Sequence, residues 1–214
     1  MKFNKMKKTI IISTLALGLV ACGTTENKES NDSKSTTHEI VKTKSLTYSI
    51  KIDKSVVSWK GSMIGVYAHE GDLKLTEGSL TTEDGAITEG EFTVDMNTMI
   101  TTDDDALYEM APREKLIGHL KAPDFFDTEQ FPTGNFKIKS VEGDVITGDL
   151  TLKGVAKEAT INAVSTTETD GNISATGTLV FNRQDYGITY KNTMNDMVLS
   201  DDIELTISIE GAIK

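Results

Sequence analysis

The sequence predicts an all-β fold, a closed antiparallel barrel of about eight strands with one short helical segment around residues 112–127. Apolar and polar residues alternate through most of residues 46–214, as they do in strands that bury one face. Turn-forming residues such as Asp-Gly separate these runs at regular intervals. The C-terminal run is long and one-sided, and closure into a barrel leaves such a strand no unpaired edge.

The predicted strands follow one another through hairpin turns. Their inward-facing apolar positions lie in the runs Leu46–Ile52, Leu73–Leu75, Phe92–Met96, Leu150–Leu152, Val155–Ala163, Ile173–Phe181 and Ile203–Ile209. Four inward positions are small: Ala159, Ala163, Ala175 and Gly177. A barrel of eight strands is either filled by side chains or wide enough for one small ligand, and small inward residues favour the ligand. Glycine in a strand also marks bends, so both readings stay open.

One segment departs from the strand pattern. Pro112 suits the first turn of a helix, Leu116 and Leu120 lie four residues apart on one face, and Pro123 should end the helix. The stretch 118–137 that follows carries four of the seven Phe residues. A segment this apolar must cover something, and we expect it to close one mouth of the barrel, with Phe125 and Phe126 acting as a gate or as a fixed plug.

An acidic run, Thr101–Asp105, precedes the helical segment. It has the residue types of a metal site but lacks the Gly and Glu at the spacing of a calcium loop. We interpret it as a helix N-terminal cap and a solvated acidic loop.

The first 21 residues carry the features of a bacterial signal peptide. Four Lys precede an apolar run of 13 residues, which has the length of a signal-peptide core and is short for a membrane span. The sequence Leu19-Val20-Ala21-Cys22 resembles the lipobox of bacterial lipoproteins, in which the Cys is lipidated. Cys22 is the only Cys, so it has no partner for an internal disulfide. We expect export and anchoring to a bacterial membrane through Cys22, on the periplasmic face or the cell surface.

Residues 22–45 are polar and predict a disordered tether, in which His38 is exposed to solvent. One globular domain, residues 46–214, remains. Without the four Lys of the signal peptide the formal charge is −15, since 18 basic residues face 33 acidic ones. This charge argues against a nucleic-acid partner and against peripheral binding to anionic lipid head groups.

Several motifs resemble the YceI-like family of polyisoprenoid-binding proteins in their order and spacing. They are Trp59-Lys60-Gly61, His69-Glu70-Gly71, the Gly78–Met96 stretch, the Leu116–Asp127 stretch, Phe131-Pro132 with Phe136, the Gly148–Val155 stretch and the Phe181–Ile188 stretch. The resemblance runs from about Leu46 to the C-terminus. It implies an extended lipocalin-like, eight-stranded antiparallel barrel with an isoprenoid amphiphile threaded into it. The family's soluble periplasmic members do not have a lipobox. Its presence here favours a protein that functions close to one membrane.

The predicted ligand contacts are the inward strand residues and the apolar residues of the helical segment. They are Phe92, Val94, Leu116, Leu120, Phe125, Phe126, Phe136, Leu150, Leu152, Ile161, Leu179, Phe181, Leu205 and Ile207. Burial contributes roughly 25 cal/mol per Å² of apolar surface, so these residues can hold a prenyl tail without a polar anchor. Arg183 is a further candidate, either paired with an acid such as Asp185 or facing a phosphate or quinone head group. Trp59 is either part of the core or a ligand contact.

The sequence favours a binding protein over an enzyme. It contains no nucleophile elbow, no HExxH motif and no His/Cys cluster typical of a metal site. Together with the ligand class that the resemblance implies, this leads us to expect a protein that holds a prenyl quinone or polyprenyl lipid for storage, sequestration or transfer, with no required cofactor or metal. One alternative is a lipid-modifying enzyme that uses His119 or His69 with a carboxylate. The other is an envelope stress-response protein that acts through partners and has a barrel filled by side chains.

Overall fold

The computed structural model describes residues 43–109, 111–191 and 198–214. The expected signal peptide, the lipidated Cys22 and nearly all of the polar tether, His38 included, lie outside the described residues. These expectations therefore stay predictions.

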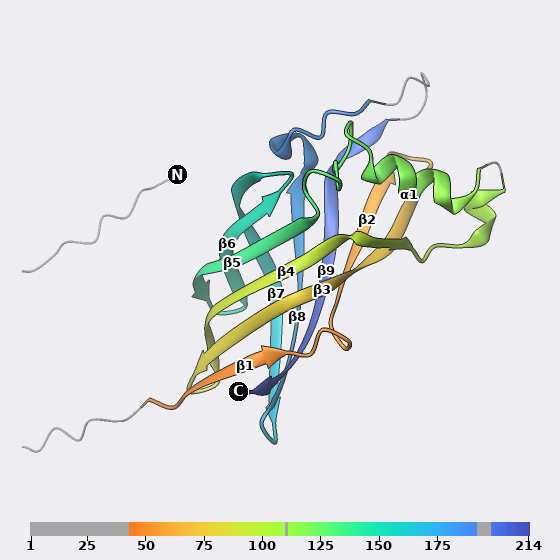
Figure 1. Cartoon of the computed structure of the whole chain (residues 1–214). Helices are drawn as coiled ribbons and strands as arrows, with labels where there is room; N and C mark the ends of the chain where they lie inside the picture. Colours follow the sequence, from red (N-terminus) through yellow and green to blue (C-terminus); the bar gives the residue numbers. More distant parts are fainter. Residues whose placement is uncertain (1–42, 110, 192–197) are drawn as a thin grey trace, which may run out of the picture. The chain divides into compact units, whose positions relative to one another are not determined.

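The described chain consists almost entirely of strands (Figure 1). The strands are β1 (Ser45–Ile50), β2 (Val56–Met63), β3 (Tyr67–Glu83), β4 (Ala86–Thr101), β5 (Thr133–Glu142), β6 (Val145–Leu152), β7 (Val155–Thr169), β8 (Asn172–Asn182) and β9 (Leu199–Ile213). The helical elements are α1 (Arg113–Lys121) and two short 3-10 helices, η1 (Asp105–Tyr108) and η2 (Arg183–Tyr186). Within the described ranges, no helix combines the length and the apolar composition that crossing a membrane requires.

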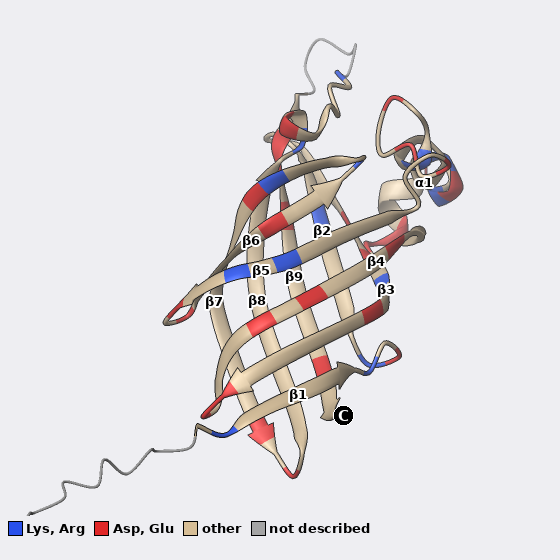
Figure 2. Cartoon of the chain, turned by 60° about the vertical axis from the view of Figure 1, so that its left-hand side comes forward, with Lys and Arg blue, Asp and Glu red and all other residues tan. Residues whose placement is uncertain are grey.

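The sheet closes into an eight-stranded antiparallel barrel, which confirms the predicted fold class. From β2 to β9 each strand pairs with its neighbour in sequence, and β9 pairs back onto β2. In Figure 2, strands β3, β4 and β5 of one side of the barrel lie at an angle to strands β7, β8 and β9 of the other side. Closure satisfies the backbone N–H and C=O groups of the wall without help from the interior.

The ninth strand, β1, shares one position in the barrel with β2. Both pair antiparallel with β3, β2 through Tyr67–Lys74 and β1 through Ser79–Glu83, and both also pair with β9. Ser55 lies at the break between them, where its hydroxyl donates to the carbonyl of Lys51 (2.9 Å) and accepts from the N–H of Glu210 (3.0 Å). The two strands therefore act as one interrupted stave, and the buried Ser55 satisfies backbone groups at the interruption.

Two details of the predicted strands were wrong at their ends. Ile52, expected to face inward, is 45% exposed, because β1 ends at Ile50 and a turn follows. The covering segment was expected to run to residue 137, but β5 begins at Thr133. Phe136 therefore faces the barrel interior from a strand and does not belong to the segment that covers the mouth.

On β8 and β9 the alternation of apolar and polar residues turns the predicted apolar face toward the interior. In β7 a bulge interrupts this alternation. Ile173 and Leu179 are 2% exposed or less. The pairing of β7 with β8 shifts register between Asn162 and Ser165, and Ala163, with φ of 52°, is exposed there. An extra residue in a strand reverses the faces beyond it, which is why Ala163 points outward and the next residue inward.

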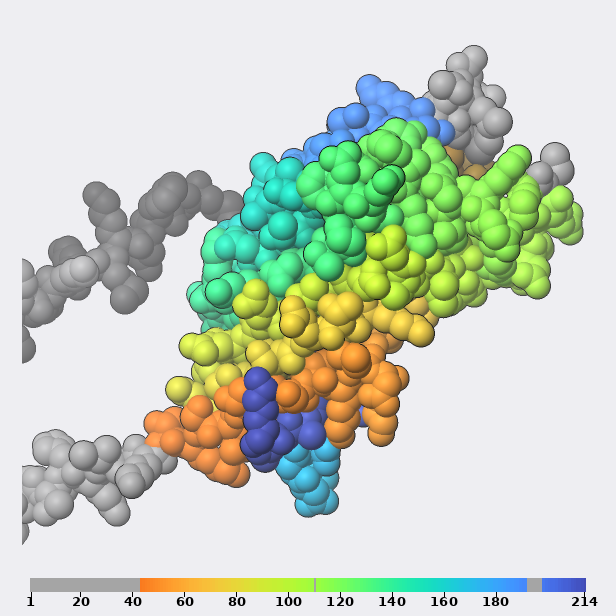
Figure 3. Space-filling model, viewed as in Figure 1, coloured from red at the N-terminus to blue at the C-terminus, as the bar shows by residue number. Residues whose placement is uncertain are grey.

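Helix α1 lies between the two prolines that were expected to bound it. Helix α1 starts directly after Pro112 and ends at Lys121, and Ala122 before Pro123 is extended. Hydrogen-bonded turns follow, in which the N–H groups of Phe125 and Asp127 donate to the carbonyl of Ala122. The green segment that contains α1 packs against one end of the barrel (Figure 3).

We predict that Gly71→Ala destabilises the barrel. A Cβ there would lie 1.9 Å from the carbonyl oxygen of Ile100 and 2.5 Å from the ring of Trp59. Overpacking of this kind costs about 1–3 kcal/mol in the free energy of unfolding, which urea denaturation measures. Gly118→Ala is the matched control, because nothing lies within 4 Å of its Cβ and alanine favours a helix interior. Equal stability of the two variants would contradict the prediction.

Candidate ligand-binding cavity

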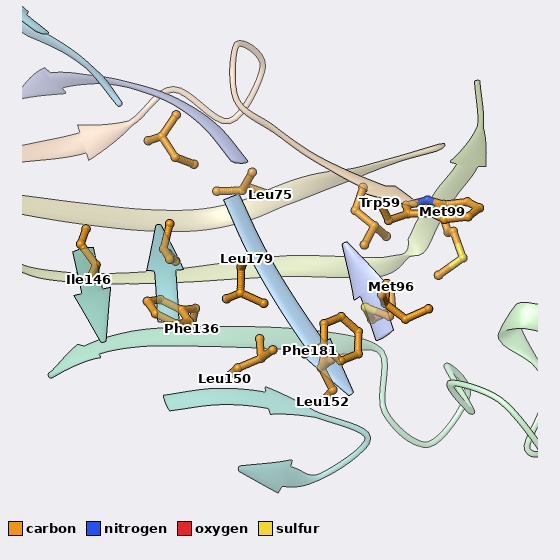
Figure 4. Close-up of a cluster of buried hydrophobic side chains, with 14 of the residues drawn as sticks. Trp59, Leu75, Met96, Met99, Phe136, Ile146, Leu150, Leu152, Leu179 and Phe181 are labelled. Carbon is orange, nitrogen blue, oxygen red and sulfur yellow. The ribbon is translucent and has the colours of Figure 1, made fainter. Parts of the chain in front are cut away.

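The inward faces of the strands surround a cavity of about 280 Å³. Aliphatic, aromatic and Met side chains from β2 to β9 converge on it (Figure 4). Its volume lies near the lower end of the roughly 300–1,000 Å³ typical of ligand pockets. No Lys, Arg, Asp or Glu among the described residues lines it. The cavity therefore suits an uncharged, largely apolar molecule.

The two ends of the barrel differ. At the end where β1 begins, Tyr48, Leu80 and Thr82 are 2% exposed or less and fill the interior. At the end that carries α1, lining residues such as Leu116 and Phe126 keep part of their surface accessible. We call this α1 end of the cavity, with its half-buried lining residues, the mouth.

The structure brings the predicted apolar residues together. Phe92, Val94, Leu116, Leu120, Phe125, Phe126, Phe136, Leu150, Leu152, Ile161, Leu179, Phe181, Leu205 and Ile207 all line the cavity. Trp59 also lines it while being 9% exposed, so it is both core and cavity wall. That these residues contact a ligand stays a prediction. Of the four small positions, Ala175 and Gly177 line the cavity, Ala159 packs against the core, and Ala163 faces outward.

Arg183 does not line the cavity. Its side chain is 2% exposed, and its guanidinium donates to the carbonyls of Ser200 (3.0 Å) and Ile188 (2.6 Å) and to the carboxylate of Asp201 (2.8 Å). The partner is Asp201 and not Asp185, the acid named from the sequence. These contacts tie η2 to the start of β9 and use the donors that a head group would need.

The sequence analysis missed several lining residues. Met63, Met99 and Tyr190 line the cavity near α1, together with Val57 of β2. Met99 and Met96 both face inward although they are three residues apart, so β4 breaks strict alternation at its end. Residues 56–63 gave no clear alternating pattern, and Tyr190 lies outside any strand. The strand-like content of Val56–Met63 was the one signal that could have revealed β2.

His69 lines the cavity and is held by a polar cluster outside it. Its Nδ1 lies 2.8 Å from a carboxylate oxygen of Asp103 and 3.2 Å from the hydroxyl of Tyr108. The other oxygen of Asp103 accepts from Arg113 of α1 at 3.1 Å. Asp103 thus joins the start of β3 to helix α1. Asp104 of the acidic run caps the 3-10 helix η1, because its side chain accepts from the N–H of Ala106. Helix α1, which the run was expected to cap, starts after Pro112 without a side-chain cap.

The prediction of a solvated acidic loop was wrong for Asp103, whose side chain is 6% exposed. Burial opposes the ionised form, but hydrogen bonds from Tyr108, His69 and the N–H of Glu70 outweigh it and lower the pKa of Asp103. The physical reason is that His69 of β3, Tyr108 of η1 and Arg113 of α1 converge on the carboxylate of Asp103.

His119 lies at the mouth on α1. Its ring meets Phe125 edge-on at 5.6 Å and Tyr190 at 4.5 Å between centroids. Its Nδ1 lies 3.8 Å from a carboxylate oxygen of Asp124, beyond hydrogen-bond distance. In residues 43–109, 111–191 and 198–214, no three His, Cys, Asp or Glu side chains are grouped as metal ligands would be.

The fold and the cavity together define a closed antiparallel barrel built around an internal apolar cavity. A model of the YceI-like domain matches residues 48–211, which confirms the resemblance seen in the motifs. The chain therefore belongs to the YceI-like family.

Curated relatives are similar to the chain in sequence, and solved structures are similar to it in fold. The UPF0312 protein SA2479 of Staphylococcus aureus strain N315 is 36% identical over 105 residues, which are 44% of this chain and 60% of the relative. The chain thus spans about three fifths of the length of that curated relative. The fold is similar to Burkholderia cenocepacia BcnA, with a TM-score of 0.61, 18% identity, and coverage of 75% of this chain and 98% of BcnA. A polyisoprenoid binding domain from Saccharophagus degradans gives a TM-score of 0.50 at 13% identity, with 79% and 99% covered.

We predict that Asp103→Asn lowers the free energy of unfolding by about 1–2 kcal/mol at pH 7, because it removes charge-assisted hydrogen bonds from a buried carboxylate. The pKa of Asp103 is lowered in the folded state, so its contribution is present above the ordinary Asp value of about 4 and is lost as the pH falls through the folded pKa. Urea denaturation at several pH values should show the gap closing in acid. Asp105→Asn is the control, since Asp105 pairs with Arg113 from a side chain that is 96% exposed. A gap independent of pH would contradict the prediction.

Proposed function

We propose that the barrel binds an isoprenoid amphiphile, a prenyl quinone or a polyprenyl lipid, with its tail in the cavity. The observation that carries the proposal is the apolar cavity, which is filled at the β1 end and accessible at the mouth. The domain from Saccharophagus degradans with a similar fold is described as a polyisoprenoid binding domain, which supports the same ligand class here.

The hydrophobic effect is large enough for this role. Burial contributes roughly 25 cal/mol per Å² of apolar surface, so a tail that buries about 200 Å² gains about 5 kcal/mol before the costs of association. A preformed cavity lowers those costs, because the closed wall holds the lining residues in place whether or not a ligand is bound. The tail needs no polar contact to stay in the barrel.

The proposed role is storage, sequestration or transfer, without catalysis. No Ser, Cys or Lys among the described residues lines the cavity. The alternative in which side chains fill the whole barrel loses its physical basis, since a cavity remains. An enzyme could use either His69 with Asp103 or His119 with Asp124. The His69–Asp103 pair is accounted for by its contacts with Tyr108 and Arg113, and Nδ1 of His119 lies 3.8 Å from the carboxylate of Asp124.

We also propose export and lipid anchoring through Cys22. The lipobox supports the anchor, and the strand that follows the predicted tether, β1, begins at the filled end of the barrel. The anchor would then join the barrel at the end away from the mouth, which leaves the mouth free to take up or release a lipid.

We predict that Ala175→Phe weakens binding of a prenyl quinone at least tenfold, because the ring occupies cavity volume next to the lining of β8. Isothermal titration calorimetry on the delipidated protein measures the change. Val180→Phe is the matched control on the same strand, since Val180 faces outward and is 55% exposed. Val57→Phe fills the same cavity from β2 and provides a second test if the first variant folds poorly. Unchanged affinity in both folded cavity variants would rule out binding in the cavity.

We predict that Cys22→Ala moves the protein from the membrane to the soluble fraction of the host. The physical reason is that lipid chains contribute about 0.8 kcal/mol per buried CH₂, and the substitution removes the only thiol that can carry them. Cell fractionation and immunoblotting measure the distribution, with Ser30→Ala in the predicted tether as the control. Retention of the Cys22→Ala variant in the membrane would speak against the anchor.

A further inference from the structure

Two buried polar side-chain atoms in the described part of the chain have no hydrogen-bond partner. They are Nε1 of Trp59 and Nε2 of His119. Both residues line the cavity. More than nine tenths of buried polar groups in proteins are hydrogen-bonded, and leaving one unpaired costs free energy. Because both residues line one cavity, a molecule inside it is the candidate partner for the two atoms.

Both atoms belong to the mouth half of the cavity. Trp59 pairs with Gly71 of β3, and Gly71 pairs with Thr101, the last residue of β4 before the segment that leads to α1. His119 lies on α1 itself. The far half is lined mainly by aliphatic residues such as Leu80, Ile146 and Ile209, with Thr176 of β8 as a polar member. A ligand with one polar end would therefore place its tail in the far half and its head near α1.

The ring of His119 is fixed in orientation. Phe125 and Tyr190 pack against it edge-on, and its Nδ1 edge faces Asp124, whose side chain is 56% exposed. The Nε2 edge is the buried one. The imidazole can accept from a hydroxyl at Nε2 or donate to a carbonyl there, depending on the tautomer, whereas the indole N–H of Trp59 only donates.

The cavity lining offers no countercharge to an anionic head. No cation lines the cavity among the described residues, and two basic side chains near the mouth are engaged elsewhere. Lys121 donates to the carbonyl of Asn97, and Lys153 donates to the carbonyls of Pro123 and Phe125. A phosphate in the cavity would be a buried charge without a partner, which is strongly unfavourable.

We propose that Trp59 and His119 form a head-group site for a neutral oxygen-bearing head, either a quinone carbonyl or a prenyl hydroxyl, and that prenyl phosphates are excluded. The inference rests on the proposed function, since it names the head of the isoprenoid that the cavity holds. The tail supplies most of the binding free energy, and the two polar atoms select the head and fix the direction in which the molecule enters.

The test uses calorimetric titration of the delipidated protein with four probes in one detergent. These are a geranylgeranyl naphthoquinone, geranylgeraniol, geranylgeranyl monophosphate and squalene, an isoprenoid hydrocarbon without a head group. The variants are His119→Phe, which keeps an aromatic ring between Phe125 and Tyr190, and Trp59→Phe, which removes the indole N–H. Thermal unfolding is measured alongside to separate folding from binding.

We expect the wild-type protein to bind the quinone or the alcohol at least tenfold more tightly than the phosphate. Each variant should weaken binding of that preferred probe about 3- to 10-fold, the effect of one lost hydrogen bond, and leave squalene within about twofold. Preference for the quinone over the alcohol would indicate that both groups donate, and the reverse preference that His119 accepts.

Two results would overturn the head-group site while leaving the proposed function intact. One is phosphate binding as tightly as the neutral probes. The other is an equal loss for squalene and for the headed probes in the variants, which would mean that the two side chains act through packing. Failure of all four probes to bind the wild-type protein would overturn the proposed function itself.

Discussion

The closure of the sheet between β2 and β9 is the constraint on which the rest of the structure depends. Once β9 pairs back onto β2, the wall satisfies its own backbone hydrogen bonds. Within this closed wall the side chains fill the interior at the β1 end and leave a cavity in the rest. The residues that do fill it, among them Tyr48 and Leu80, lie at the end where β1 completes the interrupted stave. The arrangement of the strands thus determines where the barrel closes, which end is filled by side chains and where the cavity lies.

The aromatic residues between Gly118 and Lys137 belong to two different parts of the structure, the turns after α1 and strand β5. Phe125 and Phe126 lie in hydrogen-bonded turns after α1, whereas Phe136 belongs to β5. Phe125 is 4% exposed and packs against His119, while Phe126 keeps accessible surface. The segment is therefore part cover and part wall, and the half-buried Phe126 is the member placed at the mouth.

Sequence alone predicted the fold well because its signal is local. The period-two pattern of β8 and β9 and the prolines around α1 each encode their own structure, and the fourteen apolar residues expected inside do line one cavity. The failures involve information that is not local. The bulge that turns Ala163 outward depends on the register with β8, and the burial of Asp103 depends on His69, 34 residues away. For Arg183 the sequence left the pairing acid open, and the partner, Asp201, comes from the next strand.

Two clusters of charged side chains connect the elements around the cavity, and none of these Asp and Arg residues lines it. Asp103 binds His69 of β3 and Arg113 of α1 from outside the cavity, and Arg183 does the same for η2 and β9. Both clusters fix elements at the α1 end, where the wall is least complete and a loose helix would expose the interior. The charges of each cluster pair within that cluster. Of the described polar residues that line the cavity, Trp59 and His119 carry the buried side-chain atoms without a partner, so in the proposed site discrimination between heads depends on hydrogen bonding to these two residues.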